Sequence, residues 1–272
     1  MSLWDRILEP QGLTTLFQPI FEVSGGERSV FALEALTRGP QGTNIERSDV
    51  LFEYVRRKRR EVEVDLLAIE SALRQARGLP YVPALSINVH ASTLERDPRL
   101  ASWLAGVSGE YELPLHRLII EIIEHAPPWN GPHFLRTLDE LRDLGVRIAL
   151  DDVGLGQSNF RMILDCRPDL LKIDRHLVAR AHADPLRRAV LETISDLAVR
   201  LGGQAVAEGI EDERDLAAVA ETGIHLFQGY LLCEPACSRD LRKMDFMHAP
   251  RNGAADRRAD DITREIPIVP RD

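Results

Sequence analysis

The chain has 272 residues, 44% of them hydrophobic, and a formal net charge of −9 at pH 7. This length fits one large domain, because α/β barrels commonly reach it with a single core. The acidic balance excludes the broad basic footprint that binding to a nucleic-acid backbone requires, so we expect no nucleic-acid polymer as a partner. The acidic balance does not exclude a small anionic substrate, which would bind through cations gathered locally.

No run of 18 apolar residues occurs, and the first twelve residues lack the basic and apolar regions of a signal peptide. We therefore expect no membrane segment and a cytoplasmic location. The cysteines Cys166, Cys233 and Cys237 are odd in number and show no CxxC spacing, which favours reduced thiols over disulfides or a zinc site.

Short apolar or β-branched runs alternate with longer amphipathic segments, as in βα units around a parallel sheet. Eight runs are predicted strands: Leu16–Val23, Val30–Leu36, Ala84–Val89, Leu118–Ile123, Arg147–Val153, Leu170–Ile173, Gln204–Glu208 and Leu226–Leu232. The predicted helices include Glu46–Arg77, Ser92–Leu104, Pro132–Leu144, Pro185–Leu201 and Glu211–Thr222. This order predicts the α/β class and a TIM-like (β/α)8 barrel.

The connection between the first two strands departs from this order. Only the stretch around Ser24–Glu27 joins them, which is too short for a crossover helix and suits a hairpin. We therefore expect the first strand to run antiparallel to the rest. The barrel is assigned to residues 13–248, after a lead-in at 1–12. Residues 249–272 are charged and contain proline, which predicts a poorly ordered tail.

Polar side chains stand in the last part of the second to seventh predicted strands or just beyond them, where each apolar run ends. In barrels of this kind the active site forms at the carboxyl ends of the strands. At any single strand a carboxylate is more often a helix N-cap, but agreement across six strands favours a shared site. Its candidate residues are Glu34, Asn88, Glu121, Glu124, Asp151, Asp152, Lys172, Asp174, Glu208 and Glu211.

Carboxylates that converge on one barrel mouth raise each other's pKa unless cations neutralise them. Oxygen ligands without His or Cys favour Mg²⁺ or Mn²⁺. The adjacent Asp151 and Asp152 would let one carboxylate bridge two ions, an arrangement that recurs in phosphodiester hydrolysis. Lys172 fits as a cation that orients groups or manages a proton; the alternative is a salt-bridge partner that stabilises the acidic ring.

Seven ordered motifs, together with Phe17-Gln18-Pro19-Ile20, resemble the EAL-domain cyclic di-GMP phosphodiesterases over roughly residues 13–236. The motifs are Glu34-Ala35-Leu36 followed by Arg38, Leu85-Ser86-Ile87-Asn88, Glu121–Glu124, Asp151–Gly154, Leu171–Asp174, Ala207–Glu211 and Gln228–Tyr230. The resemblance implies hydrolysis of one phosphodiester bond of cyclic di-GMP to linear pGpG, with two Mg²⁺ or Mn²⁺ ions.

The resemblance also implies roles for individual residues. One ion would be held by Glu34, Asn88, Glu121 and Asp151, and the second by Asp151, Asp152 and Glu208. Lys172 would help to position the attacking water. The substrate side would comprise Gln18 near a guanine, the backbone near Leu36 and Arg38 at a phosphate, Gln228 hydrogen-bonded toward Glu34, and Asp174, Glu211 and Pro235. Glu124 and Glu211 would support the loop after strand five and the outer shell of the site.

The loop after strand five departs from the family pattern. Active members usually read DDFGTGYSS there, whereas this chain reads DDVGLGQSN over residues 151–159. In the family this loop positions the second metal and contributes, with the helix that follows, to homodimer contacts. Two functions therefore stay open: a phosphodiesterase with low or conditional activity, and an inactive cyclic di-GMP receptor or protein-interaction module.

The basic run Arg56–Arg60 is interpreted as a solvated helix face balanced by Glu61, Glu63 and Asp65. The alternatives are a scaffold surface and a patch that steers an anionic ligand toward the barrel mouth.

Overall fold

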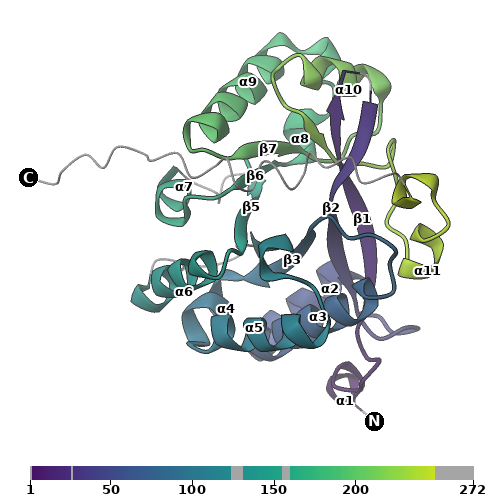
Figure 1. The fold of residues 1–272 in the computed structure, drawn as a ribbon, viewed down its shortest axis with the longest axis vertical. Helices are drawn as coiled ribbons and strands as arrows, with labels where there is room; N and C mark the ends of the chain where they lie inside the picture. Colours follow the sequence, from purple (N-terminus) through teal and green to yellow (C-terminus); the bar gives the residue numbers. More distant parts are fainter. Residues whose placement is uncertain (1, 26, 124–130, 155–159, 249–272) are drawn as a thin grey trace, which may run out of the picture.

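The computed structural model describes residues 2–25, 27–123, 131–154 and 160–248. Its strands form a closed barrel in chain order (Figure 1), and each predicted strand is present. They are β1 Thr14–Ser24, β2 Glu27–Arg38, β3 Leu85–His90, β4 Leu118–Ile123, β5 Arg147–Val153, β6 Leu170–Ile173, β7 Gln204–Ala207 and β8 Leu226–Phe227.

The first strand is the exception to parallel pairing, as predicted. β1 pairs antiparallel with β2 on one side and with β8 on the other, while the other neighbouring strands run parallel. The tight β1–β2 connection leaves no room for a crossover helix, and so forces this hairpin.

Helices surround the barrel: in Figure 1, α2 to α6 lie below the strands and α8 to α10 above them. Their bounds are α1 Leu3–Ile7, α2 Ser48–Lys58, α3 Glu61–Ala76, α4 Ala91–Arg96, α5 Leu100–Glu110, α6 Pro132–Asp143, α7 Phe160–Cys166, α8 Arg175–Val178, α9 Pro185–Arg200, α10 Glu213–Ala220 and α11 Ser238–Leu241. Short 3₁₀ turns cover Leu115–Arg117, Ala181–Ala183 and Asp245–His248. Within the described ranges, no helix has the length and apolarity needed to cross a membrane.

Two predicted helices are each divided in the structure. The segment Glu46–Arg77 breaks after α2 because Arg59 adopts a left-handed conformation at φ 55°. The segment Ser92–Leu104 breaks at Asp97, whose extended backbone is the conformation favoured before a proline, here Pro98. The first segment therefore forms α2 and α3, and the second forms α4 and α5.

The last strand is shorter than predicted. It ends at Phe227 instead of continuing to Leu232. Beyond it, Gly229 lies against the backbone of Ile210, so closely that a Cβ atom would stand 2.1 Å from the Ile210 carbonyl oxygen. This close approach carries the chain out of the sheet. The described cysteines are free, as predicted.

The barrel interior has an apolar layer with one residue for each strand, where Ala84 stands directly before β3: Ile20, Ala32, Ala84, Ile119, Ala149, Leu170, Val206 and Leu226. Side chains alternate along a strand, so the residue two positions farther also faces inward. In β1, which runs the opposite way, that residue lies two positions earlier. The resulting layer is a polar ring of Gln18, Glu34, Ser86, Glu121, Asp151, Lys172, Glu208 and Gln228.

Candidate metal centre

Lys172 joins the carboxylates of the polar ring. Its Nζ lies 3.2 Å from Glu34, 2.6 Å from Glu208 and 3.8 Å from Asp151, and it donates a hydrogen bond to Glu121. Only 2% of the Lys172 side chain is exposed. The structure thus contains the salt-bridge arrangement that was one reading of this lysine, whereas its orienting role in a reaction stays a prediction.

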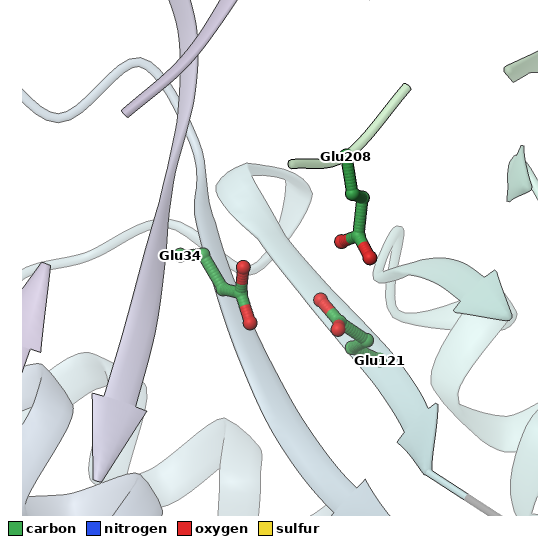
Figure 2. A group of neighbouring side chains, drawn as sticks. All are labelled: Glu34, Glu121 and Glu208. Carbon is green, nitrogen blue, oxygen red and sulfur yellow. The ribbon is translucent and has the colours of Figure 1, made fainter. Parts of the chain in front are cut away.

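Three of these carboxylates are close enough to share a cation. Glu34, Glu121 and Glu208 each offer an oxygen, and these oxygens lie within 4.8 Å of one another. Figure 2 shows the three side chains reaching toward a common centre, Glu34 from β2, Glu121 from β4 and Glu208 from the residue directly after β7. Closure of the barrel therefore gathers residues that are up to 174 positions apart in the chain (208 − 34).

Neutral side chains orient the acidic ones. Asn88 Nδ2 donates to Glu34 at 3.0 Å, and Gln228 Nε2 donates to Glu34 at 2.6 Å and to Gln18 at 3.2 Å. These contacts bear out the expected hydrogen bond between Gln228 and Glu34.

Ser86 is a member of the polar ring that the sequence-based prediction missed. Its hydroxyl donates to Glu121 at 2.9 Å, and its side chain is buried. The signal was present in the alternation of Leu85-Ser86-Ile87-Asn88, where serine and asparagine share one face of the strand. A hydrogen bond that holds the charged form of a carboxylate prepares it to act as a ligand.

The electrostatics of the ring show an excess of negative charge. Burial raises the pKa of Glu121 well above its usual value, and the charge of Glu34 adds to the effect. Burial likewise raises the pKa of Glu208 to about 8. Burial alone would lower the pKa of the Lys172 ammonium, but the surrounding carboxylates outweigh it and raise that pKa well above its usual value.

The residues present fit a divalent cation. Four carboxylates, from Glu34, Glu121, Asp151 and Glu208, face the single ammonium of Lys172, so one positive charge opposes up to four negative ones. All candidate ligand atoms are oxygens, the donor type that Mg²⁺ and Mn²⁺ prefer. Further positive charge would relieve the repulsion that raises the carboxylate pKa values.

Stability without metal is expected to depend on pH through Glu208. The pKa of Glu208 is about 8 in the folded protein, above the usual 4.5. Protonated Glu208 therefore stabilises the folded state fully below pH 4.5, and this stabilisation is lost as the pH rises through 8. We expect the free energy of unfolding of chelator-treated protein to fall by roughly 2–4 kcal/mol between pH 5 and pH 8. Urea titrations at several pH values measure it. Glu208→Gln should make the profile shallower, with the remaining slope due to groups such as Glu121, whose pKa is also raised, whereas an unchanged slope in this variant would assign the whole profile to other groups.

Other predicted residues lie at the rim of the barrel. Asp152 has a left-handed backbone at φ 53°, and its N–H donates to Asp151 Oδ1 at 2.9 Å. Arg38 is half-buried at the end of β2 and donates to the Thr37 carbonyl. Leu36 and Pro235 are half-buried.

Two acidic residues of the predicted substrate side have partners of their own. Asp174 caps α8 by accepting from the His176 N–H at 2.6 Å. Glu211 is half-exposed and lies 3.8 Å from Arg175. Glu124 and the divergent positions 155–159 lie outside the described residues.

The basic run Arg56–Arg60, at the end of α2 and in the turn to α3, is mostly the solvated surface that was expected. Arg60 pairs with Glu63, but Glu61 pairs with Arg96 instead, at 3.5 Å. The prediction was wrong for Asp65, which is fully buried. Helical periodicity turns this residue toward the barrel, away from the arginines.

Known proteins resemble this chain in sequence and in fold. The EAL domain family matches residues 3–235. The cyclic di-GMP phosphodiesterase NbdA of Pseudomonas aeruginosa is 29% identical over 92% of this chain and 32% of its own length. Klebsiella pneumoniae BlrP1, solved with cyclic di-GMP and manganese, superimposes with a TM-score of 0.75 at 28% identity, over 85% of this chain and 57% of that one.

A standalone EAL protein from Vibrio cholerae, solved with cyclic di-GMP, superimposes with a TM-score of 0.73 at 26% identity, over 83% of this chain and 93% of that one. The first curated relatives are longer: the chain spans 24% of the length of Escherichia coli PdeD and 48% of PdeG.

Proposed function

The chain belongs to the EAL domain family, and from this premise we propose that it hydrolyses one phosphodiester bond of cyclic di-GMP to give linear pGpG. The observation that carries the proposal is the polar ring, where Lys172 and four carboxylates meet at the carboxyl ends of the strands. A phosphodiester carries negative charge and resists attack by water, so its hydrolysis needs a site able to concentrate positive charge.

Glu34, Asn88, Glu121 and Asp151 would hold one Mg²⁺ or Mn²⁺ ion, and Asp151, Asp152 and Glu208 the second. When bound, two such ions lower the pKa of an attacking water and screen charge on the attacking and leaving oxygens. The hydrogen bonds from Asn88 and Gln228 hold the Glu34 carboxylate in one orientation. This preorganisation lowers the cost of assembling the site.

Lys172 would position the attacking water with one of its three N–H donors. Burial among carboxylates keeps this amine protonated, because its pKa is raised well above the usual value. It therefore serves as a donor and a positive charge, and does not take up the proton released by the water.

Arg38 would bind a substrate phosphate. Burial lowers the pKa of its guanidinium, and among described residues its side chain forms a hydrogen bond with a backbone carbonyl but no ion pair. The remaining substrate contacts would come from Gln18, Gln228 and the backbone at Leu36, with Asp174, Glu211 and Pro235 farther out.

Incubation of the pure protein with cyclic di-GMP and Mg²⁺ or Mn²⁺, followed by chromatography of the nucleotides, tests the proposal. Formation of pGpG that stops when the metal is chelated would support it. Binding of cyclic di-GMP without any product would instead establish the receptor function, which the divergent sequence at 155–159 favours.

We further propose a homodimer through α7, the helix after strand five. Phe160 and Leu164 lie one turn apart on it and are 76% and 68% exposed. Burial of two such side chains stabilises an interface by a few kcal/mol, so Phe160→Ser with Leu164→Ser should weaken dimerisation at least about tenfold. Sedimentation equilibrium measures this, with Val199→Ser on α9, 68% exposed, as the control. Equal dimerisation in both variants would exclude α7.

A further inference from the structure

Asp65 on α3 carries a buried carboxylate that the proposed reaction does not use. Asp65 is 0% exposed, and both of its carboxylate oxygens have partners. Oδ2 accepts from the backbone N–H of His90 at 2.9 Å and from the Thr93 hydroxyl at 2.5 Å, and Oδ1 lies 2.8 Å from His90 Nδ1. A buried carboxylate is tolerated because such donors replace the water it has lost.

These donors all come from the point where β3 passes into α4. His90 is the last residue of β3 and the N-cap of α4, and its own side chain makes no capping bond to that helix. Thr93 lies in the first turn. The Phe52 ring packs against the His90 ring, with centroids 5.2 Å apart. A carboxylate from 25 positions earlier in the chain therefore holds the end of β3 in place.

The strand that Asp65 anchors carries Asn88, two residues before His90. Asn88 pairs in register with Glu121, and its Nδ2 donates to Glu34. The amide of Asn88 is neutral, so no net charge draws it toward a cation, as it would draw a carboxylate. The direction of the amide oxygen therefore depends more on the position of the backbone than the direction of a carboxylate ligand does.

We propose that Asp65 is a positioning residue for the divalent-cation site: by anchoring His90 at the end of β3, it directs the Asn88 amide oxygen toward the cation. This inference rests on the proposed function, because it assumes that Asn88 is a ligand of Mg²⁺ or Mn²⁺. Residues that orient ligands from outside commonly change metal affinity about 10- to 100-fold when substituted.

The chain offers a matched control in Asp215. Its Oδ1 accepts from the His182 N–H at 3.0 Å and contacts His182 Nδ1 at 2.6 Å, while Oδ2 accepts from the Arg180 N–H at 2.8 Å. This is the same chemistry at another place, joining α10 to the turn at Ala181–Ala183. Neither His182 nor Arg180 belongs to the polar ring.

The experiment compares Mn²⁺ binding, by calorimetry or by paramagnetic resonance of free Mn²⁺, in Asp65→Asn and Asp215→Asn, with thermal melting alongside. Both variants should melt at lower temperature. Asp65→Asn should weaken Mn²⁺ binding about 10- to 100-fold, and Asp215→Asn by less than about twofold, since a distant site contributes independently. In an Asn88→Ala background, the Asp65→Asn change should have almost no further effect on affinity.

Equal Mn²⁺ affinities for Asp65→Asn and Asp215→Asn would overturn the inference, as would a full effect of Asp65→Asn in the Asn88→Ala background. If Asp65→Asn does not fold, Thr93→Val removes a single donor. It should weaken binding about threefold, against no change for Thr222→Val, whose buried hydroxyl donates to the Val219 carbonyl. Equal affinities in this second pair would likewise overturn it.

Mn²⁺ binding needs no hydrolysis, so the two proposals fail separately. A wild-type protein that binds Mn²⁺ but forms no pGpG would refute the proposed function alone. Hydrolysis by the wild type, with unchanged Mn²⁺ binding in Asp65→Asn, would refute the role of Asp65 alone.

Discussion

Glu34→Gln is expected to lower the rate of cyclic di-GMP hydrolysis by about 10³-fold, because a metal ligand supplies several kcal/mol of charge stabilisation in the transition state. Glu34 accepts from Asn88 and Gln228 and pairs with Lys172. The amide keeps the shape of this side chain but removes its charge. It also turns one nitrogen toward a neighbouring donor, which disfavours the original orientation.

Formation of pGpG at saturating Mn²⁺ measures this effect, and equilibrium dialysis measures retained binding of cyclic di-GMP. Glu192→Gln is the matched control, because Glu192 is exposed on α9 and does not belong to the polar ring. Its rate should equal that of the wild type. Should Glu34→Gln retain more than about a tenth of the wild-type rate, a loss of under 1.4 kcal/mol, Glu34 would not be an essential ligand.

Lys172→Met is expected to affect both stability and activity. The change leaves Glu34, Glu121 and Glu208 buried without their cation, and breaking a buried pair in this way costs about 3–5 kcal/mol. The loss should be largest at high pH, where the carboxylates are charged, and should shrink as they become protonated at lower pH. Loss of the water-positioning donor should lower hydrolysis by about 10²–10⁴-fold.

Mn²⁺ separates these two roles of Lys172. A divalent cation can replace the missing positive charge, so it should restore much of the melting temperature of Lys172→Met. It supplies no N–H donor, so hydrolysis should stay low. Lys58→Met, at an exposed residue of α2, should match the wild type in both measurements. Near-normal hydrolysis by Lys172→Met with Mn²⁺ would limit Lys172 to a structural role.

The strands and the places of the acidic residues could be predicted because both are local properties. Alternating apolar residues mark each strand, and a polar residue at its end marks the mouth of the barrel. The antiparallel first strand followed from a connection of a few residues. The family motifs added expected roles to the same positions.

Helix breaks and the end of the last strand were less predictable. The five basic residues Arg56–Arg60 gave no local sign that the backbone of Arg59 would be left-handed and end α2. Pro98 was a sign of the break at Asp97, but the prediction did not use it. The end of β8 at Phe227 depends on Gly229 lying against Ile210, a contact between two loops. Contacts of this kind have no signature in a single segment.

The sequence by itself determined which residues face the barrel interior, because the two-residue period of a strand is set by local backbone geometry. Only the tertiary structure decided which of them meet. Lys172 contacts carboxylates from four strands, Gln18 and Gln228 are linked across the β1–β8 closure, and Asp65 reaches His90 rather than the arginines beside it. Each contact joins distant segments, and depends on the register in which the barrel closes.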